Sequence, residues 1–346
     1  MTRASSLAGY HSPQVDVDVR LNTNESPYPP PPGFVEALAE EVRRIQWHRY
    51  PDRDAVALRE AVASFYEVGA ESVFCANGSN EVIQCVLLAI GGADRHVALF
   101  DPTYQLHTHI ADITGMPVRT YRRDPDFTLD MSEVEHACRE QPALVFACSP
   151  NNPTGTVEEP DDLHRLVARA PGLVLVDEAY GEFATTTLLA RAATEESLAV
   201  SRTFSKVWSL ASLRLGFLVG PPSLVEDLRA VALPYHLSAF TQAAGLAALR
   251  FPDEMRERIA IITAERERLF AALAAKDNVE VWPSGANFLL FRPRHGDGAA
   301  LWRRLLDRSV LVRDFSSRPL LEGCLRVSVG TPEENDRFLE ALDASL

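Results

Sequence analysis

Short apolar runs alternate with longer helix-like segments between about Asp54 and Leu249. The runs share a mostly continuous apolar character and are Ser72–Ala76, Val97–Phe100, Leu144–Cys148, Leu173–Val176, Leu198–Thr203 and Gly216–Gly220. A strand without a polar face is buried on both sides, as in a parallel sheet that helices cover. The pattern therefore predicts an α/β domain built around a mostly parallel sheet.

The pattern changes after Phe251-Pro252. A long helix is predicted there, with apolar residues at steps of three and four and with Asp253 as its cap. The strand-like segments that follow are Asn287–Phe291, Val310–Val312 and Leu325–Val329. Thr331-Pro332-Glu333-Glu334 then combines a capping box with a proline at the first helical position, which predicts a final helix.

The segment up to Pro32 has neither helical nor strand periodicity and contains the proline-rich run Pro27–Pro32, which indicates an extended arm. We therefore expect an N-terminal arm over 1–32, a large domain over 33–250 and a small α+β domain over 251–346. The arm is expected to pack with the small domain or with a partner subunit.

The composition excludes several classes of protein. The chain of 346 residues is 46% hydrophobic and 24% charged, and its apolar stretches are too short to span a bilayer. A formal net charge of −14 argues against nucleic acid or an anionic membrane as a partner. The N-terminus has no apolar signal segment, and the five cysteines are scattered, so a reduced, cytoplasmic protein is expected. Because the chain as a whole is negative, a bound phosphate would need positively charged side chains close to it.

Two candidate sites follow predicted strands directly. Asp177 stands at the carboxyl end of Leu173–Val176, where ligands of open α/β sheets collect, although a helix cap or an ion pair would also explain it. The turn Asn77-Gly78-Ser79-Asn80-Glu81 precedes an apolar helix and suits a phosphate, because the N-terminus of a helix offers free N–H groups. An ordinary N-cap is the alternative for this turn.

Two more candidates follow later strands. Pro150 and Pro153 flank Asn151 and Asn152, which would place a side-chain donor rigidly at the sheet edge, unless the segment is an ordinary turn. Lys206 lies in the apolar stretch after Thr203-Phe204-Ser205, which favours a lowered pKa and imine chemistry over a solvated surface lysine.

In combination these motifs resemble the fold-type-I aminotransferases that use pyridoxal 5′-phosphate. The order also includes D-P-T-Y (Asp101–Tyr104), V-D-E-A-Y (Val176–Tyr180) and Arg214 after the lysine, and the resemblance runs from about Leu21 to Gly330. The motifs Leu21–Glu25, Arg49–Asp52, Val176–Phe183, Leu233–Ser238 and Cys324–Gly330 are similar to those of the histidinol-phosphate aminotransferases. Ser26 and Val207–Ser212 depart from the usual pattern, which leaves substrate choice open.

The resemblance implies a homodimer with shared active sites, a mostly parallel seven-stranded sheet in the large domain, and a role for each matched residue. Lys206 would hold the cofactor as an imine and move the proton, with Asp177 at the pyridine nitrogen. Asn152 and Tyr180 would donate to the phenolic oxygen, and Tyr104 would stack on the ring. The residues expected at the cofactor phosphate are Ser79, Asn80, Glu81, Thr203, Ser205, Arg214 and, from the partner subunit, Tyr50. Those expected at the substrate are Tyr10, Asn152, Arg313 and Arg326.

The activity implied is transfer of the amino group of L-histidinol phosphate to 2-oxoglutarate, giving imidazole-acetol phosphate and L-glutamate by ping-pong chemistry in histidine biosynthesis. Transamination of aromatic amino acids and a lyase like threonine-phosphate decarboxylase remain alternatives. A non-catalytic binding module is disfavoured, because no catalytic position is missing. His107 and His109 lack the carboxylate or cysteine cluster that a metal site needs, so no metal is expected. Tyr235 and His236 are candidates for the wall of the pocket.

Overall fold

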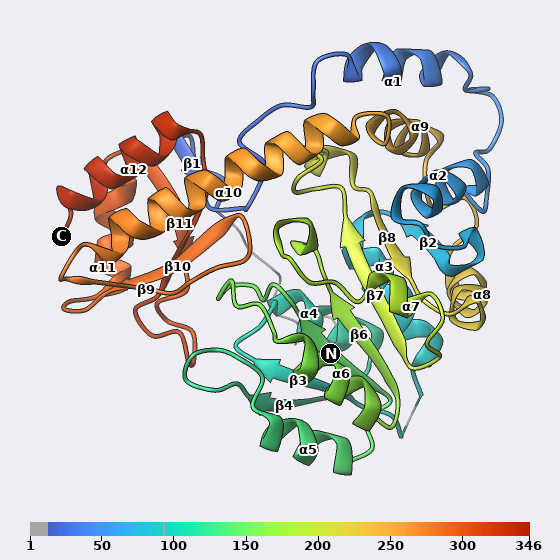
Figure 1. Ribbon diagram of the computed structural model, residues 1–346, viewed down its shortest axis with the longest axis horizontal. Coiled ribbons are helices and arrows are strands. Elements are labelled where there is room, and N and C mark those ends of the chain that lie inside the picture. The colour runs from blue at the N-terminus through green and yellow to red at the C-terminus, as the bar shows by residue number, and fades with distance from the viewer. Residues whose placement is uncertain (1–12, 93) are drawn as a thin grey trace, which may run out of the picture.

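The computed structural model describes residues 13–92 and 94–346, which form two sheets flanked by helices (Figure 1). The larger sheet has seven strands in the order β2-β8-β7-β6-β5-β3-β4. Its strands are β2 (Val73–Ala76), β3 (Val97–Asp101), β4 (Val118–Arg122), β5 (Leu144–Cys148), β6 (Leu173–Asp177), β7 (Leu198–Thr203) and β8 (Gly216–Val219). Strand β8 runs antiparallel to both of its neighbours, β2 and β7, and the other neighbouring strands are parallel, so the predicted mostly parallel seven-stranded sheet is confirmed.

Helices cover both faces of this sheet. Neighbouring residues of a strand point to opposite sides, and both sides carry apolar side chains that the helices bury. Val73 and Cys75 of β2 belong to one buried cluster, while Phe74 and Ala76 belong to another. Helices α3 (Gly78–Ile90), α4 (Gln105–Thr114) and α8 (Pro222–Val231) pack on the second cluster. The first cluster receives α1 (Phe34–Arg43), α2 (Val56–Tyr66), α5 (Met131–Arg139), α6 (Pro160–Arg169), α7 (Leu189–Ala192) and α9 (Ala239–Ala248).

The smaller sheet has five strands in the order β1-β11-β12-β10-β9. These are β1 (Val19–Leu21), β9 (Val279–Val281), β10 (Phe288–Pro293), β11 (Val310–Asp314) and β12 (Leu325–Ser328), packed with α11 (Gly298–Leu306) and α12 (Pro332–Asp343). Strand β1 comes from the N-terminal segment and pairs in parallel with β11. The long helix α10 (Pro252–Ala274) runs from the larger part of the molecule to the smaller one (Figure 1).

The two predicted helix starts in the C-terminal part have different outcomes. Thr331 and Glu334 form the expected capping box at α12. The prediction that Asp253 caps α10 is wrong, because α10 already begins at Pro252 with Phe251 at the N-cap position and no side-chain cap bond. Asp253 therefore lies in the first turn, where it pairs with Arg256.

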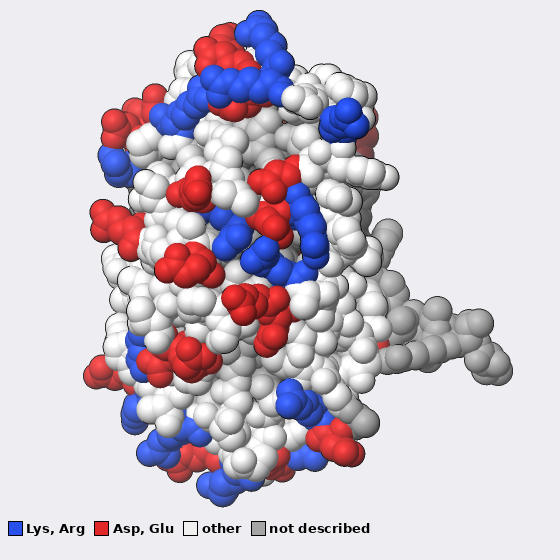
Figure 2. Space-filling view, turned by 90° about the vertical axis from the view of Figure 1, so that its right-hand side faces the viewer, with Lys and Arg blue, Asp and Glu red and all other residues white. Residues whose placement is uncertain are grey.

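Charge is distributed without a basic field on the face drawn in Figure 2, where lysine and arginine side chains are interleaved with aspartate and glutamate. Among the helices of the described residues, none has the length and apolar character needed to cross a membrane.

Candidate active site

A cavity of about 320 Å³ opens at the carboxyl ends of β5, β6 and β7, where Cys148, Asp177 and Thr203 end their strands. Parallel strands bring their carboxyl ends to one edge of the sheet, so residues that are distant in sequence meet there. The cavity is lined by Thr23, Glu25, Ser79, Asn80, Tyr104, Cys148, Asn152, Asp177, Ala179, Tyr180, Thr203, Ser205, Lys206, Ala211, Ser212 and Arg214.

Asp177 is 1% exposed, and three hydrogen bonds hold its carboxylate. Oδ1 accepts from the backbone N–H of Ala179 at 3.0 Å and from the Ser201 hydroxyl at 3.3 Å. Oδ2 lies 2.9 Å from Nε2 of His107, a fully buried ring that stacks on Phe146. A buried carboxylate needs such partners, and these partners fix its direction at the wall of the cavity.

Lys206 is half-buried, and it lines the same cavity. Its Nζ donates to the backbone carbonyl of Thr23 at 3.2 Å and lies 5.6 Å from the ring centroid of Tyr180. Burial, with the positive charges of Arg326 and Arg214 nearby, lowers the pKa of Lys206 to about 7. A large fraction of the amine is therefore neutral near neutral pH, which is the form that attacks a carbonyl carbon.

The Tyr180 hydroxyl is held by two amide donors. Nδ2 of Asn24 donates to it at 2.9 Å and Nδ2 of Asn152 at 3.4 Å. Burial raises the pKa of Tyr180 above its ordinary value, so the hydroxyl keeps its proton and can donate it in a hydrogen bond. The Asn24 contact joins the N-terminal segment to the residues that follow β6.

The turn before α3 is packed closely against β8. A Cβ atom at Gly216 would lie 2.5 Å from backbone atoms of Gly78 and Ser79, so only glycine permits this approach. Gly78 has a positive φ of 78°, and a Cβ there would meet the Arg214 guanidinium at 2.7 Å. The N-terminus of α3 and a guanidinium are thus brought together at the cavity.

Hydroxyl groups complete this part of the cavity. The Thr203 hydroxyl donates to Oγ of Ser205 at 3.0 Å, and Arg214 Nη1 donates to the same oxygen at 3.3 Å. Unpaired N–H groups of a helix N-terminus, hydroxyl donors and an arginine form a typical set of phosphate ligands.

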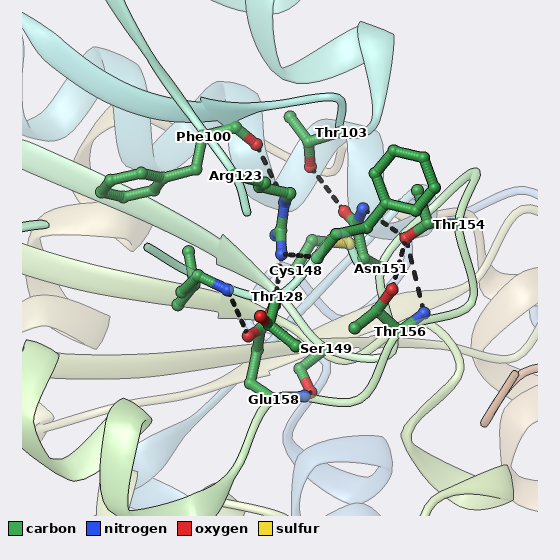
Figure 3. Close-up of polar contacts among 12 residues, drawn as sticks. Phe100, Thr103, Arg123, Thr128, Cys148, Ser149, Asn151, Thr154, Thr156 and Glu158 are labelled. Atoms are coloured by element: carbon green, nitrogen blue, oxygen red, sulfur yellow. Dashed lines mark hydrogen bonds and ion pairs between the residues drawn. The ribbon is translucent and has the colours of Figure 1, made fainter. Parts of the chain in front are cut away.

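A network of buried hydrogen bonds stabilises the loop that carries Asn152 (Figure 3). Nδ2 of Asn151 donates to the carbonyl of Pro102 at 2.9 Å and to the Thr154 hydroxyl at 2.8 Å, while Oδ1 of Asn151 accepts from the Thr103 hydroxyl at 2.9 Å. The fully buried ion pair between Arg123 and Glu158 lies beside this loop (Figure 3). Asn151 therefore has a structural role, and its neighbour Asn152 faces the cavity.

Arg313 and Arg326 lie opposite each other on β11 and β12, so their side chains leave the same face of the smaller sheet. Both are buried. Arg326 donates to Oδ1 of Asn152 at 2.5 Å and to the carbonyl of Asn22 at 2.9 Å, which connects this arginine pair to the cavity wall.

Six of the predicted residues that the structure describes are not among those that line the cavity, namely Tyr50, Glu81, Tyr235, His236, Arg313 and Arg326. Arg326 is connected to the cavity through its bond to Asn152. Tyr50 is 79% exposed and stacks on Tyr235 at the surface, with ring centroids 4.5 Å apart. The side chain of Glu81 bonds to Asn77 and His236. Tyr10 lies outside the described residues.

Sequence reasoning missed two contacts of the site. His107 was considered only as a metal ligand, yet its ring holds Asp177. It lies three residues after Tyr104, a spacing that places two side chains on one face of a helix, and this signal could have assigned it to the site. Asn24 belongs to a quoted motif, but its contact with Tyr180 spans 156 residues of sequence.

The donor set fits pyridoxal 5′-phosphate. A buried carboxylate, an amine of lowered pKa and a phosphate cradle surround one cavity of a size that takes a small cofactor. In the described residues no group of histidine, cysteine, aspartate and glutamate could hold a metal ion.

Comparison with known proteins agrees with this donor set. Residues 16–342 match the family model of aminotransferases of class I and II. The histidinol-phosphate aminotransferase of Frankia casuarinae is 44% identical, over 98% of this chain and 88% of the relative.

Two solved structures show the same fold at lower sequence identity. The histidinol-phosphate aminotransferase of Sinorhizobium meliloti, solved in complex with pyridoxal 5′-phosphate, has a TM-score of 0.86 at 22% identity and covers 95% of this chain and 92% of its own. The L-threonine-O-3-phosphate decarboxylase of Porphyromonas gingivalis has a TM-score of 0.81 at 24% identity and covers 94% of this chain and 98% of its own. The chain belongs to the pyridoxal-phosphate-dependent class I and II aminotransferases and, within them, to the histidinol-phosphate aminotransferase family.

Proposed function

We propose that this chain transfers the amino group of L-histidinol phosphate to 2-oxoglutarate, forming imidazole-acetol phosphate and L-glutamate in histidine biosynthesis. The observation that carries the proposal is the buried arginine pair, which is tied through Asn152 to a cavity holding the Lys206 amine. A planar guanidinium binds either a phosphate or a carboxylate in bidentate fashion, so one pair can serve both substrates in turn. The 44% identity to a histidinol-phosphate aminotransferase supports the same assignment.

In this proposal each residue around the cavity has a defined task. When bound, pyridoxal phosphate supplies a ring that accepts the electron pair left when the substrate α-carbon loses its proton. Lys206 takes and returns that proton, and Asp177 keeps the pyridine nitrogen protonated. Asn152 and Tyr180 hold the phenolic oxygen, and Tyr104 stacks on the ring. The phosphate is held by Ser79, Asn80, the backbone of Glu81, Thr203, Ser205 and Arg214.

The test is a comparison of kcat/KM for histidinol phosphate, histidinol, phenylalanine and threonine phosphate at one 2-oxoglutarate concentration. We expect histidinol phosphate to exceed histidinol by about 100-fold or more, because a substrate without phosphate cannot form charge-assisted hydrogen bonds with the arginine pair. Arg326→Lys should impair both half-reactions and reduce the preference for histidinol phosphate over histidinol. Lysine keeps the positive charge but cannot form the two parallel hydrogen bonds of a guanidinium. Arg303→Lys, at an exposed position of α11, is the matched control.

Two outcomes would overturn the substrate assignment. Phenylalanine as the better substrate would identify an aromatic aminotransferase. Release of CO2 from threonine phosphate without an amino acceptor would identify a decarboxylase, which shares this fold.

The proposed enzyme is a cytoplasmic homodimer. Five buried free thiols suit a reducing compartment. An apolar groove lies beside exposed aromatic and aliphatic side chains, which on a monomer would be a costly surface. The exposed residues of this patch are Trp47, Tyr50, Leu233, Tyr235 and Phe240. A second copy of the chain would cover the patch and bring Tyr50 to the phosphate of the neighbouring cofactor.

Shared sites predict complementation between two inactive variants. If Tyr50→Phe is severely impaired, mixing it with Lys206→Ala should restore activity, because the heterodimer contains one site with both residues intact. Random exchange at equal concentrations should restore about a quarter of the wild-type activity, since half the dimers are mixed and each has one working site. Subunit exchange is verified by two different affinity tags. Heterodimers that remain inactive would place Tyr50 outside the neighbouring site.

A further inference from the structure

His236 lies in the segment Leu233–Ser238, outside the residues that line the cavity, yet it contacts the turn before α3. Its Nδ1 lies 3.0 Å from Oε2 of Glu81, and because a carboxylate only accepts, the proton is on Nδ1. The His236 backbone carbonyl accepts from Nδ2 of Asn77 at 2.9 Å. The imidazole also stacks on Phe74 of β2, with 10° between the ring planes. One residue thus contacts the strand, the cap and the first turn that lead into α3.

Glu81 receives all its bonds on one oxygen. Oε2 accepts from the Asn77 backbone N–H at 2.6 Å and from Asn77 Nδ2 at 2.8 Å, in addition to His236. Burial alone would raise the pKa of Glu81, but the hydrogen bonds from His236 and Asn77 outweigh it and lower the pKa below its ordinary value. A charged carboxylate is therefore held two residues after Ser79, which lines the cavity.

This placement has an electrostatic consequence. The positive N-terminus of a helix attracts anions, so the Glu81 carboxylate and the cofactor phosphate would compete for the first turn of α3. Glu81 is not among the residues that line the cavity, and its oxygen is occupied by Asn77 and His236. The contacts with His236 and Asn77 hold the carboxylate outside the lining of the cavity.

The same segment reaches the exposed apolar patch. Tyr235, next to His236, has a left-handed φ of 61° and stacks on Tyr50. Such a backbone conformation is costly for a residue other than glycine and persists where surrounding contacts impose it. Leu233–Ser238 therefore contacts both the phosphate turn of its own subunit and the surface proposed to meet the partner.

We propose that His236 is a positioning residue for the cofactor phosphate, which acts by holding the Glu81 carboxylate outward and fixing the first turn of α3. The inference rests on the proposed cofactor site but not on the identity of the amino substrate. Its effect belongs to the phosphate alone, since His236 contacts none of the groups proposed to hold the ring.

The experiment measures the affinity of the cofactor-free protein for pyridoxal phosphate and for pyridoxal, by absorbance titration. His236→Phe keeps a ring beside Phe74 but loses the bond to Glu81, and we expect pyridoxal phosphate to bind about tenfold more weakly or worse, with pyridoxal unchanged. His236→Asn, whose amide N–H can replace Nδ1–H, should retain most of the affinity. His236→Ala, which requires no space for a new ring, should show the same loss as His236→Phe. His164→Phe, on an exposed position of α6, is the control.

A double variant separates positioning from general destabilisation. Glu81→Gln removes the competing charge, so in the His236→Phe background it should restore part of the affinity for pyridoxal phosphate. Affinities of His236→Phe and His236→Ala within about twofold of wild type would overturn the proposal. Equal losses for pyridoxal and pyridoxal phosphate would also overturn it. A wild-type protein that binds neither compound would instead refute the proposed cofactor site.

Discussion

The Lys206→Ala variant is expected to lose both its covalently bound cofactor and its turnover. The wild-type amine lines the cavity, and its pKa is lowered to about 7, so a neutral amine that can act as a nucleophile is available there. Alanine removes the proposed nucleophile and proton carrier, and turnover should fall by about 10⁴-fold or more. Absorbance of the purified protein and steady-state assays measure the two effects.

The sequence offers a sharp control for this experiment. The chain contains only two lysines, Lys206 and Lys276. Lys276 bonds to Asp343 near the C-terminus, away from the residues that line the cavity. Borohydride treatment of wild type should attach the cofactor to the peptide containing Lys206, and Lys276→Ala should behave as wild type. A reducible visible band with normal turnover in Lys206→Ala would show that another group is the nucleophile.

Replacement of Asp177 should leave a protein that folds but reacts slowly. Asp177→Ala is expected to bind the cofactor weakly, because the pyridine nitrogen loses its charged partner. Asp177→Asn keeps the shape and a donor or acceptor for His107, so it should retain more cofactor while remaining slow. We expect loss of α-proton transfer by about a hundredfold or more in both variants, the order found when one preorganised electrostatic contact is removed.

Deuterium exchange at the substrate α-carbon measures this step separately from cofactor affinity. Asp227→Asn, at an exposed position of α8, is the matched control. If Asp177→Ala exchanged the α-proton within about threefold of wild type, Asp177 would be a structural residue that only holds His107, Ala179 and Ser201 in place.

Some strands could be predicted because a run of apolar residues marks them as buried. Strands β5 and β7 have the predicted bounds, since all residues of both strands are buried and both strands begin with a run of apolar residues. Strand β4, at the edge of the larger sheet, was not predicted, because only Tyr121 of its five residues is buried. Strand β1 has three residues and pairs with β11, more than 280 positions away, so no local sequence pattern predicts it.

The sequence by itself indicated which residues gather at the cavity. The combination of motifs and its family resemblance indicated Lys206, Asp177, Asn152 and the turn around Ser79. Each lies at or shortly after the end of a predictable strand, and the carboxyl ends of parallel strands lie at one edge of a sheet. The turn Asn77–Glu81 could also be placed at a helix start from its residue types, and α3 begins there at Gly78.

Only the tertiary structure decided how those residues are held. The His107–Asp177, Asn24–Tyr180 and Glu81–His236 contacts join residues separated by 70, 156 and 155 positions. Arg313 and Arg326 face each other because of the register of β11 and β12, and a shift of one residue would turn one of them to the opposite face. Spacing along a chain specifies neighbours within a strand or helix, whereas contacts between elements depend on how the elements pack.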